Sequence, residues 1–498
     1  MPNHLIDSLR AGSRDDMNRI FAHMPDGRTI TFAAFFAGAE RIAALLQAKG
    51  LKPGDRVAAQ VAKTVEALQL YVGTVATGGV FLPLNTGYTS AELTHFLSDA
   101  SPKIVVCDPA SIDEIAKLTD AMLLTLDAEG NGTLMDAARA ETRHVDPVSR
   151  TADDLAAILY TSGTTGKPKG AMLSHGNLAS NSQTLAKLWR FTRDDVLIHA
   201  LPVFHTHGLF VATNVALMSG ASILFHPGFD AAAILKDMPR ATALMGVPTF
   251  YTRLLQMDGL AEAAKNMRLF VSGSAPLLAE THDRWAEVTG HRILERYGMT
   301  ETNMNTSNPY DGDRRAGTVG FPLPGVDLRL RDSEGKAVAD GEPGIVQVRG
   351  PNVFKGYWNL PEKTAEELLP DGFFITGDIG RIDEDGYLHI IGRAKDLIIS
   401  GGYNVYPKEI EVQIDACGGV LESAVIGVPH PDFGEAVVAV VVPNGDVSPE
   451  VIANTIAPEL ARYKHPKQIV LVDALPRNAM GKVQKNVLRD DYAALFTP

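Results

Sequence analysis

Short apolar β-rich runs alternate with helical patterns through the first half of the chain. Residues 39–49 (AERIAALLQAK) carry apolar side chains at helical spacing and end at Gly50. Further apolar runs indicate short buried strands at residues 56–60, 102–107, 156–160 and 222–225. Strands that alternate with helices favour a largely parallel sheet with helices on its faces. We therefore expect an α/β fold with a large N-terminal domain of parallel-rich sheets covered by helices.

The pattern changes near residue 316. From there to residue 393, short β-rich pieces separated by Gly and Asp turns predict a small subdomain of mainly antiparallel strands. After Lys395, two β-rich runs and a helical pattern predict a small α+β domain. A chain of 498 residues is too long for one compact core. We predict an N-terminal domain of residues 1–394, which includes the β-rich subdomain, and a C-terminal domain of residues 395–498.

Composition excludes several classes of protein. The formal net charge of −13 argues against a nucleic-acid partner, which would require clustered Lys and Arg. Two cysteines are too few for a disulfide framework, and the first residues lack the layout of a signal peptide. The apolar stretches at residues 67–84 and 208–225 are interrupted by Gly and polar side chains. We expect a cytoplasmic protein without a membrane partner.

The segment at residues 160–170, YTSGTTGKPKG, is the strongest functional signal. It follows an apolar run, so a strand leads into a loop rich in Gly, Ser and Thr. Glycine lets backbone N–H groups approach an anion, hydroxyls add donors, and lysines add charge. The spacing differs from the P-loop, and composition alone also allows a solvent-exposed flexible loop. The candidate phosphate-binding residues are Thr161, Ser162, Gly163, Thr164, Thr165, Gly166 and Lys167.

This segment resembles the phosphate-loop signature of the adenylate-forming superfamily of acyl-CoA synthetases, luciferases and nonribosomal adenylation domains. Later segments resemble the other motifs of the superfamily in the same order: LPVFHTHG (201–208), RYGMTET (296–302), FFITGD (373–378), GRAKDLIISGGYNVYPKEIE (392–411) and PRNAMGK (476–482). The resemblance implies that a carboxylic acid and ATP form an acyl-adenylate and pyrophosphate. The acyl group then passes to coenzyme A, so the implied cofactors and cosubstrates are ATP, Mg²⁺ and coenzyme A.

The RYGMTET segment supplies groups for a reaction between two anions. Mg²⁺ needs a carboxylate ligand, and Glu301 suits that role. The resemblance implies the same metal role for Glu301 and a hydrogen bond from Thr300 to the α-phosphate. Tyr297 is expected to stack on adenine. The alternative for Glu301 is a solvated carboxylate at a helix N-terminus.

Other motif residues are expected to bind the nucleoside. The small residues Gly273, Ser274 and Ala275 follow an apolar run and admit a flat base, although a turn packed for its own sake fits the pattern too. Asp378 is expected to accept both ribose hydroxyls, and Arg393 resembles a second ribose or phosphate contact. Outside these motifs, either residue would more often belong to a surface salt bridge.

The C-terminal motifs imply a second set of roles. Lys482 would bridge the attacking carboxylate and the α-phosphate, and a lysine acetyltransferase that removes its charge is a further partner that this chemistry allows. Lys395 would be the hinge of a mobile C-terminal domain that presents one face for adenylation and another for thioester formation. Gly401 and Gly402 would line the pantetheine tunnel.

Three local features concern the acid. Residues 201–208 contain His205, which we count among the catalytic candidates. Segment 246–255 places Arg253 on a helix that is predicted to start near Pro248, and segment 302–307 is unusually polar for an acyl pocket. Polar walls with an arginine suggest a second carboxylate on the substrate. These segments resemble the malonyl-CoA synthetases of the superfamily. The hypothesis is that Arg253 binds the distal carboxylate of malonate, or of methylmalonate, in a pocket shaped by three further residues: Thr206, His207 and Met304.

Several rival interpretations remain. The chain could activate acetate, propionate or an aryl acid, or it could load a carrier protein in place of coenzyme A. The absence of Walker A and protein-kinase motifs argues against an ATP hydrolase or kinase. Intact Glu301, Asp378 and Lys482 argue against a nucleotide-binding module without catalysis.

Overall fold

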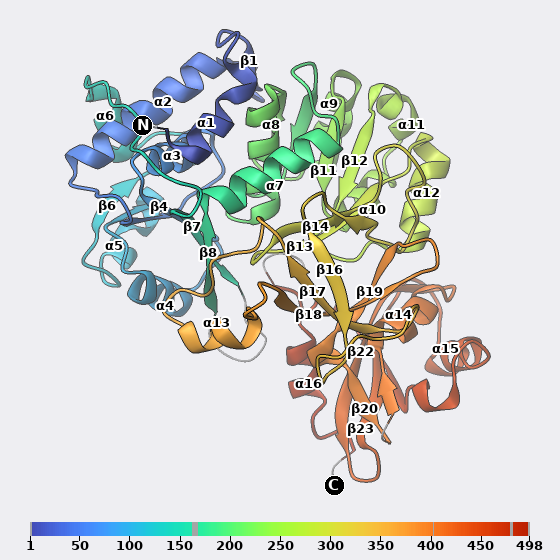
Figure 1. Cartoon of the computed structure of the whole chain (residues 1–498). Helices are drawn as coiled ribbons and strands as arrows, with labels where there is room; N and C mark the ends of the chain where they lie inside the picture. The colour runs from blue at the N-terminus through green and yellow to red at the C-terminus, as the bar shows by residue number, and fades with distance from the viewer. Residues whose placement is uncertain (1, 162–167, 402, 479–481, 497–498) are drawn as a thin grey trace. The chain divides into compact units, whose positions relative to one another are not determined.

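The chain divides into two compact units, coloured along the sequence in Figure 1. The computed structural model describes residues 2–161, 168–401, 403–478 and 482–496. One unit comprises Met1–Leu328 and Val348–Phe374, and the other comprises Arg329–Gln347 and Ile375–Pro498. The predicted β-rich subdomain, residues 316–393, is therefore divided between the two units. The predicted boundary at Lys395 concerns motion about a hinge, so it stays a prediction.

The first unit contains a six-stranded sheet. Its strand order is β6 (Met122–Thr125), β5 (Ile104–Cys107), β3 (Arg56–Gln60), β4 (Val80–Pro83), β7 (Leu155–Thr161) and β8 (Lys169–Ser174). Every neighbouring pair is parallel except β7 with β8, which form the antiparallel edge. Strand β3 has the predicted bounds, and its last four residues are buried, as expected for a central strand of a covered parallel sheet.

A nine-stranded sheet forms the other half of the first unit. Its order is β15 (Phe321–Pro322), β14 (Asn303–Ser307), β13 (Leu294–Met299), β12 (Leu269–Ser272), β11 (Ala243–Gly246), β9 (Val196–His199), β10 (Ser222–Phe225), β1 (Ile20–His23) and β2 (Thr29–Thr31). The strands from β13 to β1 are parallel, whereas β14, β15 and β2 are antiparallel to their neighbours. The predicted parallel-rich architecture is confirmed.

Helices cover these sheets. They are α1 (His4–Leu9), α2 (Phe32–Ala48), α3 (Val65–Ala76), α4 (Ser90–Ala100), α5 (Ile112–Ile115), α6 (Thr133–Ala140), α7 (His175–Leu188), α8 (Asn214–Ser219), α9 (Ala231–Asp237), α10 (Pro248–Leu254), α11 (Leu260–Ala263), α12 (Ala279–Thr289) and α13 (Pro361–Glu367). Helix α2 starts seven residues before the predicted span because Thr31 caps it, its side chain accepting from the N–H of Ala34. Helix α7 contacts β8 of one sheet and β14 of the other, so it joins the two halves (Figure 1).

The second unit is built around two smaller sheets. The four-stranded sheet has the order β16 (Asp327–Arg331), β17 (Gly344–Arg349), β18 (Phe374–Ile382) and β19 (Leu388–Arg393). The five-stranded sheet contains β21 (Tyr403–Val405), β20 (Ile398–Ser400), β23 (Gly434–Pro443), β22 (Val420–His430) and β24 (Gln468–Leu471). Its helices are α14 (Pro407–Asp415), α15 (Pro449–Ile456) and α16 (Lys485–Asp491).

Strand β23 shows how the five-stranded sheet is buried on both faces. Val437, Ala439 and Val441 pack into one apolar cluster with residues of α14 and α15. The alternate residues Val438, Val440 and Val442 pack into another with Leu488 of α16. Successive side chains of a strand point to opposite faces, so this continuous apolar run needs helices on both sides.

The apolar stretch at residues 67–84 is a buried helix followed by a strand. It includes most of α3 and all of β4, and a turn at Gly78, where φ is +73°, separates the two. Within the part of the chain that the structure describes, no helix is both long and apolar enough to cross a membrane.

Candidate functional site

Glu301 lies at the tip of the hairpin formed by β13 and β14. Met299 pairs with Asn303, so Thr300, Glu301 and Thr302 make the turn. The Glu301 carbonyl accepts a hydrogen bond from Phe354 N at 2.8 Å, and the residue is only 5% exposed. The alternative that Glu301 is a solvated carboxylate at a helix N-terminus is therefore wrong.

A single buried carboxylate fits the predicted magnesium role. Among the described residues, no group of three or more His, Cys, Asp and Glu side chains could hold a metal ion. Mg²⁺ does not need such a cage, because it usually keeps several waters and binds one or two carboxylates plus substrate phosphates. Glu301 offers an oxygen donor of the kind that Mg²⁺ prefers.

Residues 205–207, which we call the histidine corner, pack against the same hairpin. Thr206 Oγ1 donates to Asn303 Oδ1 at 2.8 Å, and Asn303 has the left-handed backbone angle φ = +51°. His207 begins a π-helical segment, η3 (His207–Thr213), and its N–H donates to Nδ1 of the half-buried His205 at 3.3 Å. Such π-turns inside helices are frequent at functional sites. Met304, the third residue predicted to shape the acid pocket, lies on β14 and is 1% exposed.

The turn that follows β12 also contacts His207. Ser274 has φ = +71°, and its Oγ lies 3.3 Å from His207 Nδ1. Gly273 is required by close approach, because a Cβ there would lie 2.3 Å from Cζ of Arg296. Ala275 follows and is half-buried. The structure therefore brings Thr206, His207 and Ser274 together beside the β13–β14 hairpin.

Arg296 is a candidate site residue that the sequence reasoning missed. It lies on β13, is 3% exposed, and its Nε and Nη2 atoms have no hydrogen-bond partner within the described residues. Burial lowers the pKa of Arg296 to about 9, so the guanidinium stays protonated at neutral pH. Burial, together with the Arg296 charge, also lowers the pKa of His207 well below its ordinary value, which keeps that imidazole neutral.

Arg253 has a different environment. It lies on α10, which begins at Pro248 as predicted, and its side chain is exposed. Its Cζ lies 5.7 Å from the ring centroid of Phe229. The substrate role of Arg253 stays a prediction.

The nucleotide candidates of the first unit are only partly described. Thr161 is the half-buried last residue of β7 and pairs with Lys169 of β8, so it opens the predicted phosphate loop. Tyr297, 9% exposed, lies on β13. The other predicted loop residues, Ser162, Gly163, Thr164, Thr165, Gly166 and Lys167, lie outside the described residues, as does Gly402.

Asp378 and Arg393 are neighbours in the second unit. They pair directly across β18 and β19, and Arg393 Nε lies 2.7 Å from Asp378 Oδ1. The Asp378 side chain is 5% exposed and that of Arg393 is 36% exposed. The two predicted nucleoside contacts thus sit together, in an ion pair that the salt-bridge alternative also describes.

The remaining predicted residues of this unit lie near turns. Lys482 is exposed, and its N–H donates to Asn478 Oδ1 at 3.0 Å while its carbonyl accepts from Asn478 N at 2.9 Å. Lys395 lies in a single 3₁₀ turn, η6 (Ala394–Asp396), and burial lowers its pKa. Gly401, with φ = +59°, follows β20.

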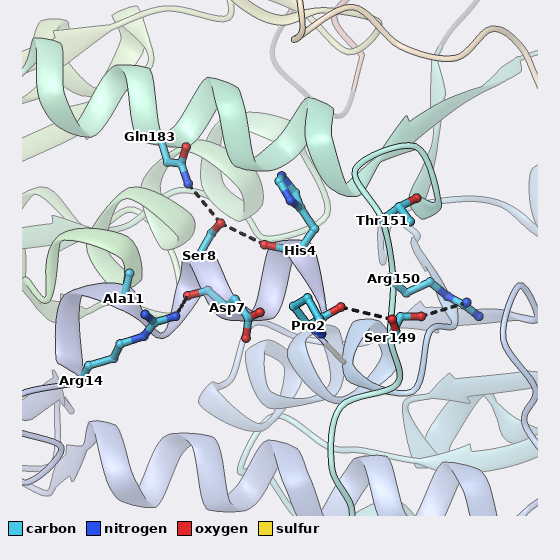
Figure 2. A pocket seen from close by; sticks show the side chains of 10 residues that line it. All are labelled: Pro2, His4, Asp7, Ser8, Ala11, Arg14, Ser149, Arg150, Thr151 and Gln183. Atoms are coloured by element: carbon cyan, nitrogen blue, oxygen red, sulfur yellow. Dashed lines mark hydrogen bonds between the residues drawn. The ribbon is translucent and has the colours of Figure 1, made fainter.

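A shallow surface hollow lies elsewhere, between α1 and the segment 149–151 (Figure 2). Its polar atoms are largely bonded to one another: Gln183 Nε2 donates to Ser8 Oγ at 3.0 Å, and Ser8 Oγ donates to the His4 carbonyl at 2.9 Å. It is lined by none of the predicted site residues. We therefore assign it no part in the site.

Comparisons with known proteins give a consistent result. The chain matches the family model described as AMP-binding enzyme over residues 10–358, and the model of its C-terminal domain over residues 409–482. It is 36% identical over 479 residues to a malonate–CoA ligase of Arabidopsis thaliana, covering 88% of this chain and 78% of that protein. It is also 36% identical over 470 residues to a feruloyl-CoA synthase of an Amycolatopsis species, covering 93% and 94%.

Two solved structures are similar over almost their whole length. The crystal structure of ATP-bound MatB from Rhodopseudomonas palustris has 58% identity and a TM-score of 0.97, with 100% of both chains covered. A benzoate CoA ligase from Burkholderia xenovorans has 28% identity and a TM-score of 0.88, with 98% of this chain and 100% of that chain covered.

Proposed function

Because this chain belongs to the AMP-binding enzyme family, we propose that it joins malonate to coenzyme A through an acyl-adenylate, cleaving ATP to AMP and pyrophosphate. Methylmalonate is a second proposed substrate, because Met304 is a flexible side chain that can admit an extra methyl group. The similarity to a malonate–CoA ligase and to ATP-bound MatB supports this activity. The observation that carries the choice of acid is the buried Arg296.

Arg296 supports a dicarboxylate substrate for a physical reason. A buried guanidinium whose donors are unmatched is costly, and a ligand carboxylate can satisfy two of them at once. Within the described residues, Nε and Nη2 of Arg296 are the unmatched donors. The guanidinium lies beside Gly273, and its charge helps to lower the pKa of His207. Benzoate or feruloyl groups would leave this charge unpaired, which disfavours the aryl-acid alternative. Arg253, exposed on α10, is the rival candidate from the sequence.

In this proposal the remaining residues bind and orient the reactants. Glu301 holds Mg²⁺, which when bound offsets phosphate charge, and Thr300 donates to the α-phosphate. Lys482 contacts the attacking carboxylate, with His205 and His207 beside the acid. Asp378 and Arg393 hold the ribose, and Tyr297, Gly273, Ser274 and Ala275 border the adenine. Lys395 acts as the hinge, and Gly401 and Gly402 admit the pantetheine arm of coenzyme A.

The test is an AMP-release assay with ATP, Mg²⁺ and coenzyme A against a panel of acids. The panel contains malonate, methylmalonate, succinate, acetate, propionate, benzoate and octanoate. Malonate is expected to give the highest kcat/KM, by a factor of about 100 over the monocarboxylates, because only a second carboxylate pairs with the buried arginine. A lead for acetate, benzoate or octanoate would refute the dicarboxylate assignment. A carrier-protein acceptor would be revealed by AMP release that depends on an added carrier protein and not on coenzyme A.

A further inference from the structure

Tyr357 connects the predicted metal ligand to a second carboxylate. Its hydroxyl lies 3.1 Å from Glu301 Oε1 and 2.6 Å from Glu367 Oε2, which belongs to α13. The tyrosine is 3% exposed, and its ring packs edge-on against Phe354 with 4.8 Å between centroids. The two carboxylates therefore meet at one phenolic hydroxyl.

The same tyrosine also contacts the strand that follows the phosphate loop. Lys169, the first residue of β8, places Nζ 4.0 Å from the ring centroid of Tyr357 and 3.3 Å from Glu367 Oε1. Lys363 adds a second cation, 3.0 Å from the same oxygen. A continuous chain of contacts thus runs from Glu301 through Tyr357 and Glu367 to Lys169, within one compact unit.

The phenol has a single proton to donate to two carboxylates. Its two contacts therefore form one three-centre hydrogen bond, in which the hydroxyl proton is shared between Glu301 Oε1 and Glu367 Oε2. Replacing the tyrosine removes the donor from both carboxylates at once.

We propose that Tyr357 and Glu367 are positioning residues for Glu301, holding its carboxylate in the orientation that Mg²⁺·ATP requires and coupling it to β8 through Lys169. The proposal rests on the proposed function in one respect, namely that Glu301 is the magnesium ligand. Partners that orient a metal-binding side chain commonly change metal affinity when they are replaced. A tyrosine that only filled space would not do so selectively.

The test measures binding in the full-length protein without any acid, so that no turnover occurs. ATP is titrated by calorimetry with and without Mg²⁺, and Mg²⁺ is titrated at a fixed ATP concentration. Tyr357→Phe is expected to raise the half-saturating Mg²⁺ concentration about tenfold, while the affinity for ATP without Mg²⁺ stays within about twofold. The matched control is Tyr71→Phe, which removes another buried hydroxyl, 3.4 Å from Asn214 Oδ1.

Two variants of Glu367 separate positioning from packing. Glu367→Leu removes the acceptor and is expected to reproduce the magnesium defect of Tyr357→Phe. Glu367→Gln keeps an acceptor for the hydroxyl and is expected to recover most of that loss. If Tyr357→Phe fails to fold, this pair decides the question, because equal Mg²⁺ half-saturation for Gln and Leu overturns the proposal.

The remaining outcomes are distinct. Wild-type Mg²⁺ dependence in Tyr357→Phe overturns the proposal, and so does an equal loss of ATP binding with and without Mg²⁺. Failure of the wild-type protein to activate malonate would refute the proposed function, yet it would leave these binding measurements interpretable. Absence of any effect of Mg²⁺ on ATP binding by the wild-type protein would remove the premise that Glu301 holds the metal.

Discussion

Two basic side chains of the first unit, Lys63 and Arg296, differ in how their donors are satisfied. Lys63 Nζ contacts the carbonyls of His199 at 2.7 Å and His226 at 2.8 Å, and His199 Nδ1 at 3.0 Å. These three acceptors match the three donors of an ammonium group, so Lys63 is complete as a structural element. Arg296 is only 3% exposed, and two of its nitrogens lack acceptors among the described residues. These unmatched donors are the reason that Arg296, rather than Lys63, is the proposed partner of the substrate carboxylate.

Replacing each arginine in turn tests this difference. Arg296→Met is expected to raise the malonate KM about 100-fold or more, because the distal carboxylate loses a buried charge-assisted partner. The ATP KM should change little. Arg253→Met is the matched variant and is expected to alter the malonate KM by less than about threefold, since its exposed charge is screened by solvent. The reverse ranking, measured by steady-state kinetics, would restore the sequence-based hypothesis for Arg253.

A charge-neutral replacement of Lys482 should affect adenylation specifically. Lys482→Gln, which also mimics acetylation, is expected to lower the rate of malonyl-adenylate formation by about 10²- to 10³-fold, because a donor to the developing charge is lost. Pyrophosphate release measures this step. Lys485→Gln is the control on the neighbouring lysine, whose Nζ is paired with Glu411. Equal losses for the two variants would contradict a specific role for Lys482.

Residue types could be predicted from the sequence better than residue environments. The RYGMTET segment contains both Arg296 and Glu301, but strand alternation alone leaves open which side chains of β13 face inward. That choice follows from the pairing of β13 between β12 and β14, and from the glycine at position 273 that leaves room for a guanidinium. These are contacts between segments distant in sequence, which a local pattern cannot report.

At the scale of elements, the side chain of His199 contacts both ends of the π-helical segment η3. Its Nε2 lies 3.1 Å from the Gly208 carbonyl and 2.9 Å from Thr213 Oγ1, at the two ends of the segment. Burial lowers the pKa of His199 well below its ordinary value, so the ring is neutral. One nitrogen then donates to η3 while the other accepts from Lys63. The position of the histidine corner therefore depends on strand β9, which carries His199.

His199→Leu should disturb the acid pocket and the fold together. The loss of two buried hydrogen-bonding groups is expected to reduce the free energy of unfolding by about 2–4 kcal/mol. The malonate KM should rise because the corner that carries Thr206 and His207 loses its support. His175→Leu is the control, since that buried ring accepts from Leu5 N at 3.4 Å instead. Thermal unfolding and kinetics measure both effects, and an unchanged malonate KM would contradict this reasoning.

Helix α14 carries a carboxyl group whose ionisation should weaken the fold. Burial raises the pKa of Asp415 from 3.8 to about 6, and its Oδ1 accepts from Ser423 Oγ at 2.7 Å. The folded state therefore retains a proton that the unfolded chain releases, so stability falls as pH rises through this window. Asp415→Asn keeps the acceptor but cannot ionise. We expect it to be about 1–2 kcal/mol more stable than wild type at pH 7, and no more stable at pH 4.

The measurement is denaturant unfolding of the full chain at pH 7 and at pH 4. The free energy is taken from the unfolding transition of the C-terminal unit, which contains Asp415. An Asp415→Asn effect that is independent of pH would contradict the role assigned to burial.

Elements were predictable where one physical signal dominated. Strands β3 and β10 have the bounds expected from their apolar runs, because central strands are buried over nearly their whole length. Helix α2 begins earlier than its apolar spacing suggested, since a cap at Thr31 sets its start. The π-helical form of η3 could not be predicted, because His199 contacts it from a different segment of the chain.

At the scale of the molecule, the compact units and the predicted hinge divide the chain at different places. The polypeptide passes from one compact unit to the other three times, after Leu328, after Gln347 and after Phe374. The predicted hinge at Lys395 lies inside the second unit, twenty residues beyond the last of these crossings. A hinge needs only a few residues that absorb a change of backbone angle, and it need not coincide with the edge of a compact unit.

Lys395→Pro tests the hinge directly. Lys395 occupies the 3₁₀ turn Ala394–Asp396, and proline tolerates the first turn of a helix while fixing φ near −65°. If Lys395 absorbs the change between two active conformations, locking φ should favour the conformation present in this structure. One half-reaction is then expected to slow at least about tenfold, while the other changes less than about threefold. Adenylation is measured by pyrophosphate release, and thioester formation by supplying malonyl-adenylate and coenzyme A. Equal slowing of both half-reactions would mean that the substitution disturbs the fold in general, and equal retention would mean that the hinge lies elsewhere.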